Sequence, residues 1–213
     1  MTTPQHNLAV IKVVGIGGGG TNAIKRMIGE GMTGVDFIAL NTDEQDLLDC
    51  DAPTKLDIGQ STTRGLGAGA DPAVGERAAR DNSQDIEDVL TGADMVFVTA
   101  GEGGGTGTGG APIVAGIARG LGALTVAVVT KPFSFEGKRR ADNAEHGIEK
   151  LRDACDTLIT IPNDRLLQQE DKTISINEAF SKADEVLFNG VQGITDLIST
   201  PGPVSYTHLR AHE

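Results

Sequence analysis

The sequence MVFVTAGEGGGTGTGG, residues 95–110, says most about the fold of this chain. Its apolar beginning, Met95–Thr99, predicts a buried strand, and Ala111–Leu121 has a helix-like pattern. A strand, a glycine-rich turn and a helix form a common phosphate-binding unit, because glycine lets the backbone approach a ligand on which successive N–H groups converge. A helix N-terminus adds partial positive charge. Glycine content alone would equally suit a flexible loop, but the position between strand and helix favours a phosphate site.

A second glycine cluster lies near the start of the chain. Leu8–Ile16 is a nearly continuous apolar run, Gly17–Ala23 follows it, and a helix is expected from Thr21 to Glu30. Read from Gly15, these residues also match G-x-G-x-x-G, a dinucleotide-binding pattern that is weak by itself. Two such loops at the ends of strands predict one binding crevice along the edge of a parallel sheet.

Composition limits the class of protein. The 213 residues suffice for one α/β domain, or for one domain and the start of another. A net charge of −12 argues against a general nucleic-acid or anionic-membrane surface, so we expect no nucleic-acid partner. No apolar run approaches the length needed to span a bilayer, so we expect no membrane insertion. Cys50 and Cys155 are typical of reduced cytoplasmic thiols. The four histidines have no metal-ligand spacing, so no protein metal site is expected.

Apolar runs alternate with helical patterns, which predicts a parallel sheet covered by helices on both faces. Strands are expected at Leu8–Ile16, Val35–Leu40, Lys55–Ile58, Met95–Ala100, Leu124–Thr130 and Thr157–Ile161. Helices are expected at Thr21–Glu30, Pro72–Leu90 with a break near Asp81, Ala111–Leu121, Glu136–Ala154 and Ser175–Ser199.

Two connections carry their own signals. The glycine-rich stretch Gly59–Asp71 is expected to be a loop on the rim of the crevice, with Asp71 as the N-cap of the next helix and Pro72 as its first residue. Ser175–Glu178 is a capping box that begins the last helix, which is long enough to be a central helix between two domains. We therefore divide the chain into a nucleotide-binding domain (1–174), a central helix (175–200) and an irregular tail of foreign origin (201–213).

The motifs together resemble a known family. Gly103–Gly109 matches the signature loop of the tubulin/FtsZ superfamily, and from Leu8 to Gly202 the chain is similar to the bacterial cell-division GTPases of the FtsZ family. The further motifs that carry this resemblance are Gly17–Ala23, Asn41–Asp43, Gly65–Asp71, Pro132–Arg140 and Ile161–Leu166. The resemblance implies a Rossmann-like α/β GTPase domain, with a mostly parallel sheet and helices on both faces, ending in a long central helix.

The resemblance also assigns a GTP/GDP site, with Mg²⁺ expected beside GTP. The residues implied to bind the α- and β-phosphates are Gly18, Gly19, Gly20, Thr21, Asn22, Gly105, Thr106, Gly107 and Thr108. Those implied elsewhere in the site are Gly69 and Ala70 at the γ-phosphate, Glu136 and Arg140 at the ribose and phosphate side, Asn163, Phe180 stacked on the base, and Asp184 with Asn22 at the base edge.

The chemistry of the last pair agrees with guanine. Phe180 and Asp184 are four residues apart and share one helix face. An ionised carboxylate only accepts hydrogen bonds, so it suits the N1 and N2 donors of guanine, whereas adenine would present an acceptor. Taken without the resemblance, Phe180 would be read as a core aromatic, and Asp184 and Arg140 as solvated surface residues.

For function, the resemblance implies a cytoplasmic protein at the mid-cell division site. It would polymerise head-to-tail with itself into the division ring and bind other division proteins through its C-terminal region. In that family, GTP hydrolysis uses an acidic loop from the neighbouring subunit. The present chain leaves the pattern after Gly202, so we expect it to be the N-terminal part of such a protein, with no catalytic residue of its own.

Three alternatives remain at this stage. An NAD(P)-dependent oxidoreductase would use Gly15, Gly17, Gly20 and Asp43, but it leaves Gly103–Gly109 unexplained. A Walker-type NTPase lacks support because no G-x-x-x-x-G-K-[ST] sequence occurs. A nucleotide-binding protein without activity stays open for a chain of this length.

Overall fold

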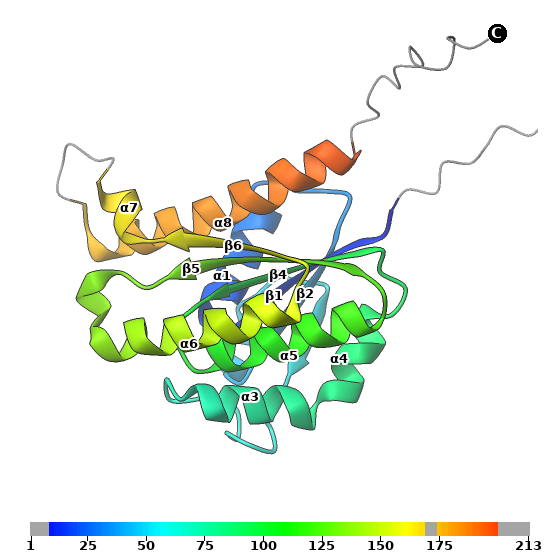
Figure 1. Cartoon of the computed structure of the whole chain (residues 1–213), viewed down its shortest axis with the longest axis horizontal. Helices are drawn as coiled ribbons and strands as arrows, with labels where there is room; N and C mark the ends of the chain where they lie inside the picture. Colours follow the sequence, from blue (N-terminus) through cyan, green and yellow to red (C-terminus); the bar gives the residue numbers. More distant parts are fainter. Residues whose placement is uncertain (1–8, 169–173, 200–213) are drawn as a thin grey trace, which may run out of the picture.

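The central feature of the computed structural model, which describes residues 9–168 and 174–199, is a fully parallel sheet of six strands in the order β3-β2-β1-β4-β5-β6 (Figure 1). The strands are β1 (Ile11–Ile16), β2 (Asp36–Asn41), β3 (Thr54–Asp57), β4 (Met95–Gly101), β5 (Leu124–Lys131) and β6 (Thr157–Pro162). All six strands expected from the sequence are present, with ends that differ by a few residues. The expected parallel sheet is confirmed.

The helices follow the predicted alternation. They are α1 (Gly17–Gly29), α2 (Glu44–Leu48), α3 (Pro72–Asp81), α4 (Ser83–Leu90), α5 (Thr106–Gly120), α6 (Lys138–Ala154), α7 (Asp164–Leu167) and α8 (Ile176–Ser199), with a 3-10 turn η1 (Ser134–Glu136) before α6. The predicted break near Asp81 is confirmed, because α3 ends there and α4 begins at Ser83. The short helices α2 and α7 were not expected, since four or five residues are too few to display a helical period.

The expected starts of two helices were wrong. α1 begins at Gly17 rather than Thr21, and α5 begins at Thr106 rather than Ala111. Low helix propensity had placed these glycines in loops. Tertiary packing overrides it: a Cβ on Gly20 would lie 2.6 Å from the Thr99 carbonyl oxygen, so only glycine lets this first turn pack against the sheet.

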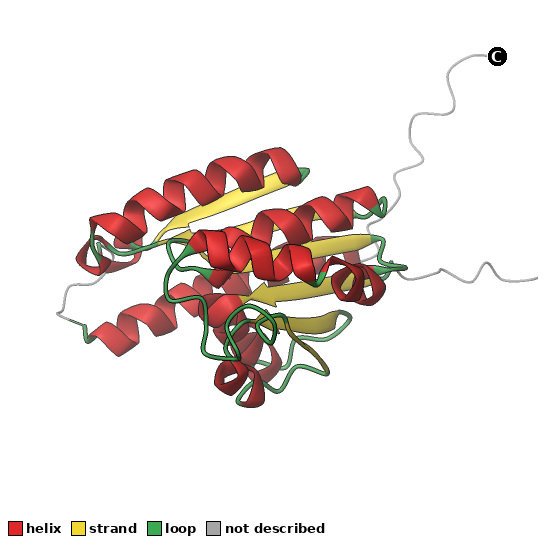
Figure 2. Ribbon diagram, turned by 90° about the horizontal axis from the view of Figure 1, so that it is seen from below, coloured by secondary structure: helices red, strands yellow, loops and turns green. Residues whose placement is uncertain are grey.

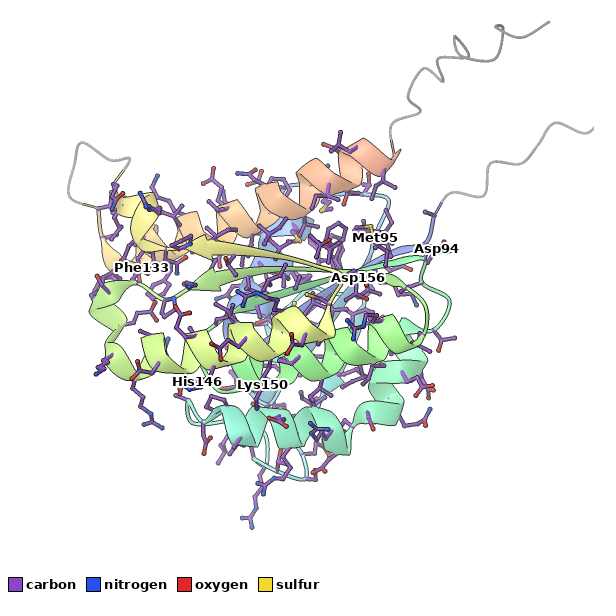
Figure 3. The ribbon with its side chains drawn as sticks, viewed as in Figure 1. Asp94, Met95, Phe133, His146, Lys150 and Asp156 are labelled. Carbon is purple, nitrogen blue, oxygen red and sulfur yellow. The ribbon has the colours of Figure 1, made fainter. Side chains whose placement is uncertain are left out.

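Helices cover the sheet in two layers (Figures 1 and 2). On one face, α3, α4, α5 and α6 bury an aliphatic cluster that includes Val98, Val114 and Leu151. On the other face, α1, α2 and α8 bury a second cluster around Ile24, Phe97 and Leu187. Within the first layer, Lys150 reaches from α6 toward α3 and pairs with Glu76 at 2.8 Å (Figure 3). Burial on both faces explains why the four inner strands, β2, β1, β4 and β5, read as largely apolar runs.

The strand order creates a switch point at the middle of the sheet. β1 lies between β2 and β4, with Ile16 paired to Ala100 at the ends of β1 and β4. The chain leaves this point toward opposite edges of the sheet, so the loops after the two strands separate and leave a crevice. Both glycine clusters follow these two strands.

The predicted capping box of the last helix is confirmed. Glu178 N–H donates to Ser175 Oγ at 3.2 Å, and Ser175 N–H donates to Glu178 Oε2 at 2.7 Å. The boundary at 174 between two domains stays a prediction, and the tail at 201–213 lies outside the described residues. None of the described helices is long and apolar enough to cross a membrane.

Candidate functional site

A cavity of about 470 Å³ opens at the carboxyl ends of the strands. Its walls come from the segments that follow β1, β2, β4, β5 and β6, from the loop at 59–71 and from one face of α8. The switch point of the sheet lies at its floor, where Ile16 and Gly101 contribute to the lining. This is the position where α/β sheets bind ligands.

Two helices begin at the cavity without any side-chain cap. α1 follows Ile16 and α5 follows Gly105, and neither of these N-cap residues offers a side-chain hydrogen bond. By contrast, Asp43 caps α2 and Asp71 caps α3. The first N–H groups of a helix have no partner inside it, and the helix dipole adds positive charge there. Neither first turn carries an acidic side chain, so the two open helix ends form a site for an anion.

The two glycine loops support one another by close backbone contact. Gly17 has φ +68°, and a Cβ on it would lie 2.8 Å from Gly107 N. The hydroxyls of Thr42 and Thr106 lie 2.6 Å apart, which ties the end of β2 to the start of α5. These contacts place the α1 and α5 termini at a fixed separation before any ligand enters.

The loop at 59–71 contributes a third segment of backbone to the cavity wall. Ala70 lines the cavity with φ 58°, which is uncommon for a residue with a Cβ. Asn143 Nδ2 on α6 donates to the carbonyls of Ala70 and Gly103 at 3.4 and 3.5 Å, so one side chain spans two loops. Strained backbone of this kind concentrates at binding sites.

An aromatic cluster and a carboxylate lie where α8 lines the cavity, away from the starts of α1 and α5. Phe180 on α8 is 39% exposed, with its ring edge-on to Phe133 and Phe135 at centroid distances of 5.5 and 6.3 Å. Phe133 lies near the start of α8, beyond the end of β5 (Figure 3). Asp184, one turn after Phe180, also lines the cavity. Burial raises its pKa to about 6, although the charges of Arg26 and Lys25 oppose the shift.

Polar groups line the wall between these two ends. Glu136 Oε1 accepts the Phe133 N–H at 2.9 Å, and Glu136 Oε2 accepts from Arg140 Nη1 at 2.6 Å. Asn163 is buried, and its Oδ1 has no hydrogen-bond partner among the residues that the structure describes. A buried acceptor without a partner is costly, so Asn163 is suited to a donor that a ligand supplies.

The structure gathers most of the predicted site residues around this cavity. Those that line it are Gly18, Gly19, Asn22, Ala70, Gly105, Thr106, Gly107, Glu136, Arg140, Asn163, Phe180 and Asp184. Gly20, Thr21, Gly69 and Thr108 are not part of the lining. The Thr21 hydroxyl donates to the Gly18 carbonyl at 3.1 Å, and the Thr108 hydroxyl accepts the Gly103 N–H at 2.8 Å, so both threonines brace the loops from within.

Some lining residues were not predicted as site residues. They include Asn41, Asp43, Asp46, Glu102 and Thr130. Asp43 carried a signal, because an aspartate before a short polar stretch is typical of an N-cap. Asn41 belongs to the Asn41–Asp43 motif and Glu102 directly precedes the signature loop, so both also carried a signal. Asp46 and Thr130 become neighbours of these residues only through the fold of segments far apart in the sequence.

The hydrogen bonds of Asp43 weaken the case for the dinucleotide-binding alternative. The strand order is the same as in dinucleotide-binding folds, so topology does not separate the two. Asp43, however, caps α2 by accepting from the N–H groups of Gln45 and Asp46 at 3.0 and 3.3 Å. That carboxylate oxygen is therefore already engaged. No cluster of three or more metal-ligating side chains occurs among the described residues.

Comparison with known proteins gives two findings. Residues 10–171 match the family model described as "Tubulin/FtsZ family, GTPase domain". An empty FtsZ dimer from M. jannaschii is 48% identical, with a TM-score of 0.89, over 94% of this chain and 58% of that chain.

Two more distant structures share the fold. The GTPγS-bound CetZ2 protofilament of Haloferax volcanii has 24% identity and a TM-score of 0.78, over 87% of this chain and 57% of that chain. The GDP-bound CetZ1 monomer of the same organism has 24% identity and a TM-score of 0.77, over 92% and 62%. The present chain thus spans about three-fifths of the length of these proteins. None of them settles a bacterial origin, which stays a prediction.

Proposed function

The chain belongs to the tubulin/FtsZ family, and from this membership we propose that its cavity binds GTP and GDP. The observation that carries the proposal is the pair of uncapped helix N-termini, α1 and α5, at one end of the cavity. The phosphates occupy this end because backbone N–H groups and two helix dipoles meet there. The anion site is made of backbone, so an acidic protein binds a polyanion without a basic surface.

Guanine occupies the end formed by α8. Phe180 stacks on the base, the ionised Asp184 accepts from N1 and N2, and Asn22 reaches the base edge from α1. Between the two ends, Asn163 Oδ1 accepts from a ribose hydroxyl, and Arg140 with Glu136 contacts the ribose and phosphate side. Gly69 and Ala70 approach the γ-phosphate. Support comes from the lining of the cavity, to which every one of these residues except Gly69 contributes.

Mg²⁺ accompanies GTP in this proposal. The described residues contain no cluster of three metal-ligating side chains, so the phosphates would supply most of the ligands. Such an arrangement suits Mg²⁺, which keeps several waters and commonly binds to substrate phosphates with few protein ligands.

The wider function is assembly into a polymer. We propose head-to-tail association between copies of this chain, with GTP hydrolysis at the contact between subunits, as part of a cytoplasmic division ring at mid-cell. Other division proteins would bind through the C-terminal region. Self-association is supported by the similar structures, which include an FtsZ dimer and a CetZ2 protofilament.

Nucleotide selectivity tests the binding proposal. GTP, GDP, ATP and NAD⁺ are titrated into the chain while its heat of binding is recorded, or they compete against a fluorescent GDP analogue. We expect GTP and GDP to bind at least about tenfold more tightly than ATP, because adenine cannot satisfy the Asp184 acceptor. Equal affinity for ATP and GTP would overturn the guanine assignment, and preference for NAD⁺ would restore the oxidoreductase alternative.

A further inference from the structure

Glu102 is a buried carboxyl group next to the proposed phosphate end of the cavity. It follows directly after β4, and its N–H donates to the Thr130 carbonyl on β5 at 2.9 Å. The residue is only 4% exposed, yet it contributes to the cavity lining. Among the described residues neither of its carboxyl oxygens forms a hydrogen bond of good geometry, and the nearby Thr108 hydroxyl favours the charged form only weakly. An unpartnered buried carboxyl is costly for the fold, and the proposed nucleotide contacts give this one no role.

The side chain lies between the phosphate loop and α6. A Cβ on Gly147 would lie 2.5 Å from Glu102 Oε2 and 2.4 Å from Thr108 Cγ2, so the carboxyl fills the space that this glycine leaves open. Thr108 in turn accepts the Gly103 N–H at 2.8 Å. Gly103 itself packs on α6, since a Cβ there would lie 2.7 Å from the Arg140 carbonyl oxygen. Glu102 therefore supports the segment that leads into α5.

Among the described residues, no Lys, Arg or His side chain forms an ion pair with this carboxyl. The first turn of α5 has no acidic residue, and four titratable side chains of β5 and α6 have partners other than Glu102. Those flanking side chains are Arg140, paired with Glu136; Lys131, paired with Glu145; Lys150, paired with Glu76; and His146, whose Nδ1 lies 2.7 Å from the Asp142 carbonyl oxygen.

The consequence is a carboxyl that keeps its proton at neutral pH. Burial raises the pKa of Glu102 to about 8, and the Thr108 hydroxyl opposes the shift only in part. Because the charged form is disfavoured in the folded state, ionisation above this pH places an uncompensated negative charge inside the protein.

We propose that Glu102 is a positioning residue that must be neutral for tight nucleotide binding: its protonated carboxyl holds the loop at 103–109 against α6, and loss of the proton loosens the loop and repels the phosphates. This inference rests on the proposed function for its ligand, a guanine nucleotide. It adds a proton-dependent control of the same site. Affinity is therefore retained at neutral pH and falls as the pH rises through the titration of Glu102.

The first experiment measures the Kd for GDP at about pH 7 and about pH 9 for the wild type, Glu102→Gln and Glu149→Gln. Glu149→Gln makes the same change on an exposed position of α6, so it is the matched control. The ratio of the two Kd values should be ~10-fold larger in the wild type and in Glu149→Gln than in Glu102→Gln, because a like charge near the phosphates acts through a poorly screened interior. Titration of guanine, phosphate and the other cavity carboxylates is common to all three proteins and cancels.

Equal ratios in the three proteins would overturn the proposal. Glu102→Met, an apolar side chain of similar length, replaces Glu102→Gln if the buried amide prevents folding, and it should show the same small ratio.

A nucleotide-free experiment separates this inference from the proposed function. Hydrogen exchange of the amides at 103–109 is measured at the two pH values in the wild type, Glu102→Gln and Glu149→Gln. The rates are compared between proteins at the same pH, because the intrinsic exchange rate rises with pH equally in all three. We expect protection in the wild type to fall several-fold relative to Glu102→Gln at the higher pH. Unchanged protection refutes the role of Glu102 even if GDP binds. A fall in protection in a chain that binds no guanine nucleotide supports the loop role and refutes the nucleotide assignment.

Discussion

The Asp184 carboxylate carries the proposed selectivity for guanine, and it is partly desolvated before any ligand enters. Asp184→Ala should weaken GTP binding by about 1.5–3 kcal/mol, the range for a hydrogen bond to a charged group. Calorimetric titration of GTP against the wild type and the variant measures this loss. Asp153→Ala, an exposed aspartate on α6, is the control and should bind as the wild type does. If Asp184→Ala bound GTP as tightly as the wild type does, another residue would have to recognise the base.

The pH dependence of Asp184 follows from the same desolvation. Its pKa is raised from 3.8 to about 6, so the charged form is penalised in the folded, nucleotide-free chain. The penalty is present above about pH 6 and is relieved as the pH falls from there toward the unfolded value. Nucleotide binding has the opposite need, because guanine requires the ionised form. GTP affinity through Asp184 should therefore decline below about pH 6, and Asp184→Ala should flatten that decline.

At the scale of elements, hydrophobic runs located the four inner strands β2, β1, β4 and β5 because those strands are almost wholly buried. The edge strands β3 and β6 are only partly buried, and β3 reads Thr-Lys-Leu-Asp, so its signal was weaker. The starts of α1 and α5 were not predictable by the same route. Their glycines are helical where propensity favours a loop, and the reason is contact with strands that lie far away in the sequence. The break between α3 and α4 at Asn82 was predicted from the sequence, but the hydrogen bonds that fix it were not. The Asn82 side chain donates to the carbonyls of Ala78 and Ile58 at 2.8 and 3.1 Å.

The junction of α5 with the sheet gives the element-scale prediction. Gly107 is helical, and a Cβ on it would lie 3.0 Å from the Gly101 carbonyl oxygen and 3.2 Å from that of Ile16. Gly107→Val should therefore displace the start of α5 and abolish nucleotide binding, with some loss of stability. Close packing, rather than an unusual φ, is the reason for glycine at this position.

Gly116→Val is the matched control for this change. It places the same side chain on the same helix, where a Cβ would meet nothing within 4 Å. Both variants are compared by GDP binding and by thermal unfolding. Normal GDP binding by a folded Gly107→Val would show that the start of α5 is not part of the phosphate site.

Over the whole molecule, the sequence indicated which loops meet, and a family resemblance indicated which side chains serve the ligand. Two phosphate-type loops after buried strands were sufficient to predict a crevice at the sheet edge. Glu102 could not be assigned in this way, because its significance depends on the space left by Gly147, more than forty residues later in the chain. The lining contributed by Asn41, Asp46 and Thr130 likewise depends on strand order, which a single sequence leaves open.

The charge arrangement of the whole cavity bears on catalysis. Among the residues that the structure describes, each cavity carboxylate is engaged, buried or at the base end: Asp43 caps α2, Asp46 accepts from Asn41, Glu136 pairs with Arg140, Glu102 is buried, and Asp184 lies beside Phe180. Phosphoryl transfer depends on positioning and electrostatic stabilisation, so a water beside the γ-phosphate needs a group that orients it. The described part of the chain therefore supplies no free carboxylate in the cavity of one copy for this purpose.

We therefore predict that GTP turnover by this 213-residue chain is near background when the protein is dilute and that catalysis needs a group from a neighbouring molecule. Exposed apolar side chains on α8, Ile176 at 62% and Leu197 at 80%, favour association between copies. Phosphate release per molecule is measured over a wide range of protein concentration, with light scattering to follow association. Turnover that is substantial and independent of concentration would contradict the prediction and place the catalytic carboxylate within this chain, with Asp43→Asn and Asp71→Asn as the first variants to examine. Low turnover in the dilute chain that rises when a longer member of the family is added would identify the missing group as one that the neighbouring subunit supplies.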